Sequence, residues 1–137
     1  YIKRFSNLYL LSRNKTTLPL SELRLSFDES LDYLRLKNKI TSLRWDAAGP
    51  VDTAVGIGLY AAFEKILESC LASLSAVFVH LKEDEDAYDL AIYVESAAEI
   101  SLLDEIHRLL PPGVGLSEES EDGMKVWTIS FKKEVGA

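Results

Sequence analysis

The feature that most constrains the fold is a long amphipathic helix followed directly by two β-rich runs. Between Asp52 and Ser75, apolar residues recur every three or four positions, which predicts a helix with one buried face. Residues 76–81 and 88–94 are rich in β-branched and aromatic side chains, and a short acidic turn joins them. Two such runs so close together predict an antiparallel hairpin, which can pack on the apolar face of the helix.

The first nineteen residues divide into a helical pattern and a break. Apolar residues recur at a spacing of three between Tyr1 and Arg13, which predicts the tail of a longer amphipathic helix. The stretch from Asn14 to Pro19 interrupts the pattern, because proline disfavours helix in the residue before it. We therefore predict a helix tail and linker over residues 1–16 and a folded domain over residues 17–137.

A second helix is predicted from Ser21 to about Lys37. Ser21 is a favourable N-cap residue, and Glu22 lies in the first turn, where the helix dipole stabilises an acidic side chain. The predicted buried stripe of this helix comprises Leu23, Phe27, Leu31 and Leu34. The next residues, 40–46, alternate in polarity and predict a strand that is buried on one side.

The C-terminal part of the chain predicts one more helix and a second hairpin. The helix extends from Glu99 to Leu110 and is stopped by a pair of prolines. Residues 115–120 and 124–132 flank Asp122–Gly123, a strong hairpin-turn signal. We predict one domain with an α+β fold, a two-layer α/β sandwich in which helices cover one face of a mixed β-sheet.

The acidic balance of the chain restricts its partners. The net charge is −7, and acidic residues gather at 82–86 and 118–122. A surface of this kind repels phosphate backbones, so we expect no binding to nucleic acid. Both clusters are interpreted as solvated hairpin turns, because runs of like charge usually lie in solvent.

Hydropathy and cysteine content favour a cytoplasmic location. The sequence has no run of 18 or more apolar residues, so we expect this segment to make no membrane contact. Cys70 lies on the apolar side of the predicted long helix and is interpreted as a buried, reduced thiol. A chain that starts at Tyr1 rather than Met is also compatible with the cytoplasmic portion of a membrane-anchored parent.

The sequence carries no complete catalytic motif. A nucleophile elbow, a Walker loop, a dinucleotide fingerprint and a zinc motif are all absent. His80 and His107 are isolated and lack the spacing of metal ligands. The pair of glycines in Gly56–Ile57–Gly58 is interpreted as a flexible start of the long helix. The sequence therefore predicts neither a catalytic set nor a metal site.

A resemblance to a known family rests on the order of the elements. The chain has a helix that carries Glu64 with a second site four residues later, then a hairpin, and a closing strand after Asp122–Gly123. This order resembles the C-terminal ATP-binding domain of sensor histidine kinases, which has the GHKL, HATPase or Bergerat fold. The segment from Tyr1 to Leu11 is similar to the end of the dimerisation helix that precedes this domain. The resemblance covers nearly the whole chain and implies a homodimeric parent in a two-component system.

The resemblance also implies a nucleotide site whose motifs are degenerate here. In this family the long helix presents an acid or amide and, four residues later, an asparagine that holds magnesium; the matching positions are Glu64 and Glu68. The adenine pocket uses an Asp-x-Gly-x-Gly sequence after the hairpin, and the matching stretch is 95–99. There Glu95 replaces the aspartate and both glycines are missing, so side chains crowd a site that needs bare backbone.

Three functions follow from these observations. The first is a degenerate, pseudokinase-like ATPase module with weak or no ATP binding and no cofactor, which contacts other domains of its parent or a response-regulator-type protein. The second is an active ATP-binding catalytic domain with divergent motifs, in which Glu64 and Glu68 hold magnesium and Glu95 binds adenine. The third is a ferredoxin-like ligand-sensing or dimerisation module. Packing of the 21–37 helix against the sheet as an integral layer distinguishes the kinase-like fold from the third.

Overall fold

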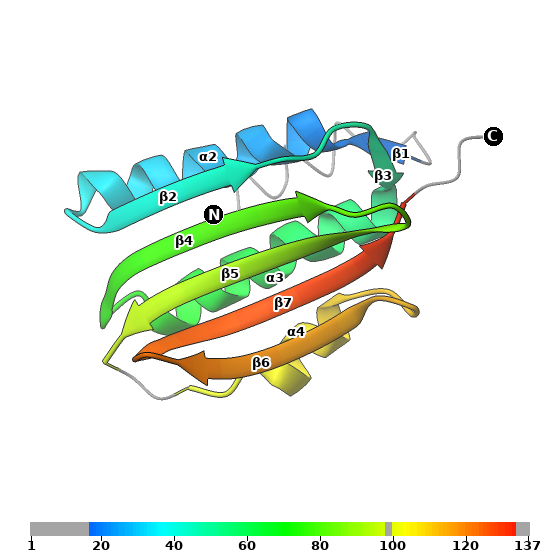
Figure 1. Ribbon diagram of the computed structural model, residues 1–137. Coiled ribbons are helices and arrows are strands. Elements are labelled where there is room, and N and C mark those ends of the chain that lie inside the picture. The colour runs from blue at the N-terminus through cyan, green and yellow to red at the C-terminus, as the bar shows by residue number, and fades with distance from the viewer. Residues whose placement is uncertain (1–16, 98–99, 134–137) are drawn as a thin grey trace.

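The computed structural model describes residues 17–97 and 100–133, in which three helices lie on one face of a five-stranded sheet (Figure 1). The helix predicted over residues 1–13 lies outside the described residues. In chain order the elements are β1 (Thr17–Pro19), α2 (Leu20–Leu36), β2 (Ile40–Trp45), β3 (Pro50–Asp52), α3 (Thr53–Cys70), β4 (Leu74–Glu83), β5 (Ala87–Ser96), α4 (Leu103–Leu109), β6 (Gly115–Glu121) and β7 (Met124–Lys132).

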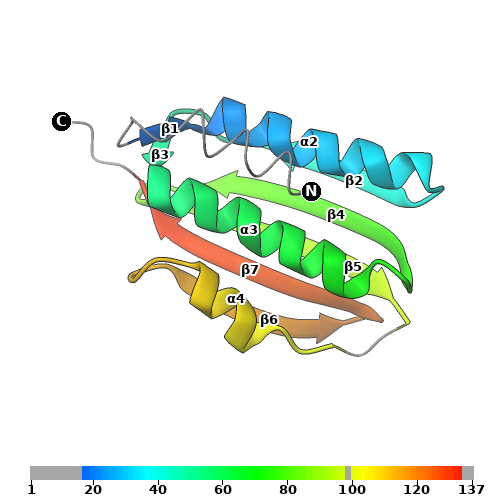
Figure 2. The same ribbon diagram turned by 180° about the vertical axis from the view of Figure 1, so that it is seen from behind.

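The large sheet is mixed and has the strand order β2-β4-β5-β7-β6. β2 runs parallel to β4, and each of the other neighbouring pairs is antiparallel. α2, α3 and α4 lie side by side on the same face, with α3 in the middle (Figure 2). This arrangement confirms the predicted α+β two-layer sandwich, because the second face of the sheet carries no helix in the part of the chain that the structure describes.

The helix α2 is an integral layer of the core. Leu23, Phe27, Leu31 and Leu34, the stripe predicted from sequence, are all fully buried. The ring of Phe27 stacks on that of Phe63 in α3, with 4.3 Å between the centroids, and also contacts Trp45 in β2. The ferredoxin-like alternative is wrong, because that fold leaves this helix peripheral.

Two short strands appear where the sequence predicted breaks. β1 and β3 pair antiparallel, with Leu18 opposite Val51 in the register. Both side chains are buried, so burial of this pair ties the start of α2 to the start of α3. α3 then begins at Thr53, and the carboxylate of Asp52 caps it by accepting the N–H of Ala54 at 2.9 Å.

Three helix boundaries differ from the prediction. α2 begins at Leu20, so Ser21 lies inside the helix and does not cap it. The helix has no side-chain cap, and the N–H of Leu20 donates to the carbonyl of Gly49. α3 ends at Cys70, because Leu74 is already buried in β4. α4 begins at Leu103, four residues later than predicted.

The glycine pair near the start of α3 is tightly packed rather than flexible. A Cβ on Gly56 would lie 2.7 Å from a side-chain carbon of Leu18, and a Cβ on Gly58 would lie 2.9 Å from the carbonyl oxygen of Leu109. Both glycines are buried within the helix. They therefore allow α3 to approach β1 on one side and α4 on the other, which corrects their interpretation as a flexible start.

The predicted Asp-Gly hairpin is confirmed. Asp122 and Gly123 have φ angles of 49° and 80°, so both occupy the left-handed region that a two-residue hairpin turn of this type requires. The turn sets the register of β6 and β7, in which Glu121 lies opposite Met124. None of the described helices has the length and apolar composition needed to cross a membrane.

We predict that Phe27→Ala destabilises the domain by about 3–5 kcal/mol, because it removes a fully buried ring from between two helices and a strand. Urea denaturation followed by circular dichroism measures the change. Leu25→Ala, at an exposed position of the same helix, is the control and should stay within about 0.5 kcal/mol of the parent chain. Equal effects of the two substitutions would show that α2 does not anchor the core.

Candidate functional site

Glu64, the predicted acid on the long helix, is buried against α2. Its Oε1 accepts a hydrogen bond from Ser30 Oγ at 2.6 Å. The same hydroxyl lies 3.0 Å from the hydroxyl oxygen of Tyr60, so three polar side chains form one chain of contacts between α2 and α3. Glu64 Oε2 is buried and has no hydrogen-bond partner among the described residues. The carboxylate therefore faces the core and not a cavity.

The other two predicted site residues lie elsewhere. Glu68 is exposed on α3, one turn after the buried Glu64. Glu95 is exposed near the end of β5, where its carboxylate accepts a hydrogen bond from Ser75 Oγ at 2.7 Å. Because Val94 packs in the core on the helix side, alternation along the strand directs Glu95 to the face without helices. The sheet therefore separates Glu95 from Glu64 and Glu68, and the predicted role of these residues in nucleotide binding stays a prediction.

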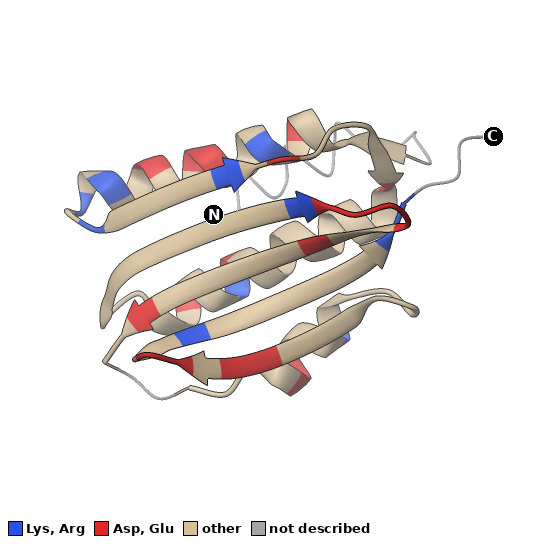
Figure 3. Ribbon diagram, viewed as in Figure 1, with Lys and Arg blue, Asp and Glu red and all other residues tan. Residues whose placement is uncertain are grey.

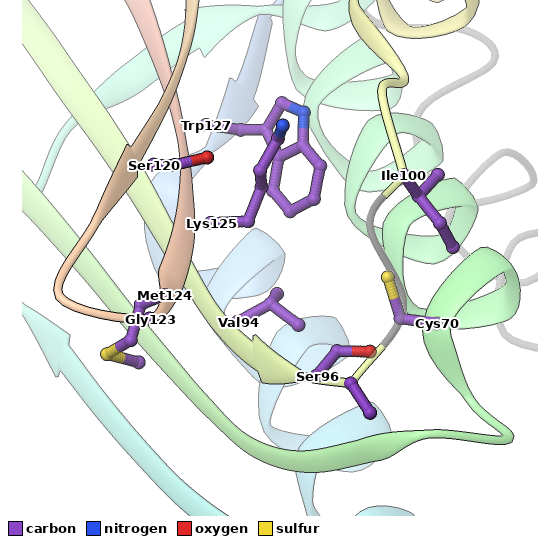
Figure 4. Close-up of a pocket in the computed structure, with 10 residues that line it drawn as sticks. Cys70, Val94, Ser96, Ile100, Ser120, Gly123, Met124, Lys125 and Trp127 are labelled. Carbon is purple, nitrogen blue, oxygen red and sulfur yellow. The ribbon is translucent and has the colours of Figure 1, made fainter.

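A cavity of about 270 Å³ lies between the C-terminal end of β5, the C-terminal end of α3 and the β6–β7 hairpin (Figure 4). Glu64, Glu68 and Glu95 do not line it, although the residues that follow Glu95 do. The side chains that matter for its chemistry are those of Cys70, Ser96, Ile100, Ser120, Lys125 and Trp127. Apolar walls, two hydroxyls and one ammonium group thus meet around one partly open cavity.

Glu118 in β6 anchors the wall of this cavity. Its Oε1 accepts hydrogen bonds from the N–H of Leu102 at 2.8 Å and from Trp127 Nε1 at 3.0 Å, and its Oε2 accepts one from Ser101 Oγ at 2.8 Å. The carboxylate thereby joins the start of α4 to β6 and β7. This contact explains why α4 begins later than predicted, since the residues just before it are held by Glu118.

The hydrogen bonds at Glu118 favour its charged form. Burial works against ionisation, but the bonds from Leu102, Ser101 and Trp127 and the charge of Lys125 together outweigh it, so the pKa of Glu118 is lowered from its ordinary value of 4.5. The acidic cluster at 118–122 is therefore not a simple solvated turn. Its residues up to Glu121 lie in β6, and the side chain of Glu118 is only 8% exposed.

Lys125 supplies the positive charge at the cavity. Its Nζ lies 4.0 Å from Glu118 Oε1, at the outer limit of an ion pair, and that oxygen already accepts two shorter hydrogen bonds. Among the described residues, Lys125 makes no hydrogen bond through its ammonium group, and its side chain is 28% exposed. A partly buried ammonium group with three donors therefore borders a partly open cavity.

Cys70 also lines the cavity, and its burial disfavours the thiolate form. The side chain is buried as predicted, and desolvation raises the pKa of the thiol, which keeps it protonated. His80 is not isolated, because its Nε2 lies 2.9 Å from Asp46 Oδ2 on the face of the sheet without helices. No cluster of three or more His, Cys, Asp or Glu side chains suited to a metal ion is found among the described residues.

Sequence reasoning missed Glu118 and Lys125, although a signal was present. A two-residue Asp122–Gly123 turn fixes the strand register, and counting back from the turn places Glu118 opposite Trp127. An acid facing a tryptophan on the buried side of a hairpin indicates a hydrogen bond to the indole N–H rather than solvation.

The fold is shared with histidine kinases of known structure. No known family profile and no curated protein matches the sequence. The catalytic domain of the histidine kinase ThkA, in a nucleotide-free form, matches with a TM-score of 0.68 and 12% identity, over 86% of this chain and 95% of that chain. The histidine kinase domain of the blue-light-activated kinase EL346 from Erythrobacter litoralis matches with a TM-score of 0.70 and 14% identity, over 93% and 77% of the two chains.

A further match is the structure of ThkA in complex with the response regulator protein TrrA, with a TM-score of 0.65 and 11% identity, over 97% of this chain and 48% of that chain. Together these similarities confirm the predicted resemblance at the level of the fold. The chain has the fold of the catalytic domains of histidine kinases.

We predict that Ser30→Ala costs about 1–3 kcal/mol of folding stability, because it leaves the buried carboxylate of Glu64 without its hydrogen-bond donor. Ser75→Ala is a matched control, since it removes a serine–glutamate hydrogen bond of similar length, 2.7 Å, at an exposed site. Thermal or urea unfolding of the two variants measures the difference. If both variants lose the same free energy of unfolding, the hydrogen bond between Ser30 and Glu64 is no stronger than the exposed one between Ser75 and Glu95.

Glu118→Gln should destabilise the domain by about 1–2 kcal/mol at neutral pH, because the variant keeps one acceptor oxygen but loses the other and the charge that strengthens these hydrogen bonds. The pKa of Glu118 is lowered in the folded state, so its contribution is complete above the ordinary value of 4.5 and is lost as the pH falls through the folded value. The difference between parent and variant should therefore shrink below pH 4.5.

Urea midpoints measured at neutral pH and at about pH 3 test this dependence. Glu119→Gln is the control, because Glu119 is exposed on the next position of β6 and should change the midpoint by no more than about 0.5 kcal/mol at either pH. A penalty for Glu118→Gln that does not change with pH would contradict the assigned pKa direction.

Proposed function

We propose that this chain is a degenerate histidine-kinase-like ATPase module of a two-component signal-transduction protein, with weak or no ATP binding. It acts as a regulatory and interaction module. Its partners are other domains of its parent protein or a response-regulator-type protein. The proposal rests on a fold that is kept, while Glu64 and Glu95 contact serines of the domain and Glu68 is exposed.

The observation that carries the proposal is the position of Glu64. Its Oε1 is engaged by Ser30 at 2.6 Å, and the side chain is 9% exposed. A magnesium ion keeps several waters and needs oxygen ligands at about 2.0–2.1 Å in octahedral geometry. A carboxylate enclosed between two helices does not fit that requirement, so the residues present do not suit Mg-ATP.

The end of β5 supports the same conclusion. Ala97 stands where the family's adenine-side motif carries its first glycine, Ser96 precedes it, and both residues line the cavity. The volume of about 270 Å³ is below the usual range for pockets that take drug-sized ligands, about 300–1,000 Å³. The acidic side chains of β6 add charge that repels a triphosphate (Figure 3).

The choice of partner follows from the comparisons. The related kinase ThkA has been seen in complex with the response regulator protein TrrA. A module of the same fold can keep such a protein contact after its nucleotide chemistry is lost, because surface complementarity does not depend on the phosphate-binding groups. This reasoning supports a response-regulator-type partner for the present chain.

The second candidate is an active ATP-binding domain with divergent ligands. It is favoured by the presence of a cavity at the C-terminal end of β5, directly after Glu95. In that case Glu95 binds the adenine amino group and Glu68 contributes to magnesium binding. Glu95 would have to turn from the open face of the sheet to reach the cavity, which makes this candidate the weaker one.

Calorimetric titration of the 137-residue chain with Mg-ATP separates the two candidates. The proposal expects no saturable heat, or a Kd weaker than about 1 mM, and no change in the titration for Glu95→Ala. Glu68→Gln should also leave the titration unchanged, since Glu68 is an exposed helix acid. A micromolar Kd that Glu95→Ala abolishes would defeat the proposal and establish the active alternative.

A further inference from the structure

The cavity beside Trp127 has the groups needed to bind a small organic acid. We propose that it binds a monocarboxylate with an apolar body, whose carboxylate contacts Lys125 Nζ and whose body lies against Trp127 and Ile100. This inference goes beyond the proposed function, because it concerns a ligand other than nucleotide. It assigns the domain a sensory site for a small molecule.

The first argument is the state of Lys125. Its nearest described carboxylate oxygen is 4.0 Å away, and that oxygen already accepts hydrogen bonds from Leu102 and Trp127. The ammonium group therefore keeps its donors for another acceptor. A ligand carboxylate in the cavity would provide a charge-assisted hydrogen bond, which is roughly twice as strong as a neutral one.

The second argument is the charge balance, which favours a singly charged ligand over a multiply charged one. Lys125 is the cation among the residues that line the cavity. Glu118 lies close to it, and Glu119 and Glu121 follow on the same strand. Lys125 and the ionised Glu118 carry no net charge together, so a monocarboxylate adds one negative charge to the site, whereas phosphates and dicarboxylates add a second one without a further cation. The site therefore discriminates against phosphorylated ligands by electrostatics.

The third argument is the shape and lining of the space. Val94, Ile100 and Trp127 supply apolar wall, and Figure 4 shows the side chains of Val94 and Trp127 directed toward the space between β5, α3 and the hairpin. Ser96 and Ser120 add hydroxyls at two sides. The lining combines polar and apolar surface, so it can contact both the carboxylate and the apolar body of such a ligand. Its volume of about 270 Å³ suits a ligand smaller than most drugs.

Benzoate is a suitable probe, because it joins one carboxylate to a flat apolar ring. Titration of the ¹⁵N-labelled 137-residue chain followed by NMR should give saturable shifts, with a Kd of about 1 mM or tighter. The indole N–H signal of Trp127 should shift, and that of Trp45, which does not line this cavity, should stay unchanged. Benzamide, the neutral analogue, should bind at least about tenfold more weakly.

Variants at lysine test the assigned contact. Lys125→Met should weaken benzoate binding at least about tenfold, and Lys125→Arg should retain most of it. Lys82→Met, at an exposed position on β4 away from the cavity, is the matched control and should bind benzoate as the parent does. Thermal unfolding of each variant confirms that it is folded before binding is compared.

Two outcomes would overturn the inference. One is the absence of saturable shifts, and the other is benzoate binding that Lys125→Met leaves intact. Neither result bears on the proposed function. Conversely, tight binding of Mg-ATP would overturn the proposed function, while benzoate binding that depends on Lys125 would still establish the acid site.

Discussion

The contact between α2 and α3 around Phe27 is the interaction on which the rest of the structure depends. Phe27 stacks on Phe63 at 4.3 Å and meets Tyr60 edge-on at 5.8 Å, so the two helices are fixed in register by aromatic rings. Ser30 lies one turn after Phe27, and Glu64 one turn after Tyr60, so the same register brings Ser30 and Glu64 into contact. Aromatic packing thereby determines that the acid on α3 is used for structure.

The position of Glu64 bears on the proposed loss of nucleotide chemistry in a shared fold. A carboxylate on this helix is available to a metal ion when it faces an open space, whereas here α2 encloses it. Removing the hydroxyl of Ser30 would not restore a ligand, because the oxygen atoms would remain among buried side chains. Exposing Glu64 to a metal ion would require a change in the α2–α3 packing as well as in the polar residues. The structural role of Glu64 therefore depends on the packing of the core.

Much of the fold could be predicted from the sequence, because periodicity reports which side of an element is buried. The stripe of α2 and the Asp122–Gly123 hairpin were both predicted in this way. The pairing of β1 with β3 could not be, since each strand is three residues long and depends on a partner more than thirty residues away. Short strands carry too little pattern to identify, and tertiary contacts decide them.

The candidate site was harder to predict because it depends on which face each residue takes. Ser30 lies on the buried stripe of α2, three residues after Phe27. This position was the available indication that Ser30 has a polar hydrogen-bond partner in the core. Glu95 was placed in the nucleotide site by its position after the hairpin, whereas strand alternation directs it to the opposite face. A resemblance in element order predicts where a residue lies along the chain. The face of the sheet that its side chain takes must be worked out from the alternation of residues along the strand.

The same counting explains how an acidic strand can border an anion site. Along β6, Glu118 and Ser120 face the helices, and Glu119 and Glu121 face the other way. The acidic cluster forms one run in the sequence, but its side chains take opposite faces of the sheet. One acid enters the core, where it holds α4 and Trp127, and it leaves Lys125 only partly neutralised at 4.0 Å. The remaining acids lie on the other face and add a repulsive background, which weighs more on a nucleotide than on the singly charged ligand that we propose.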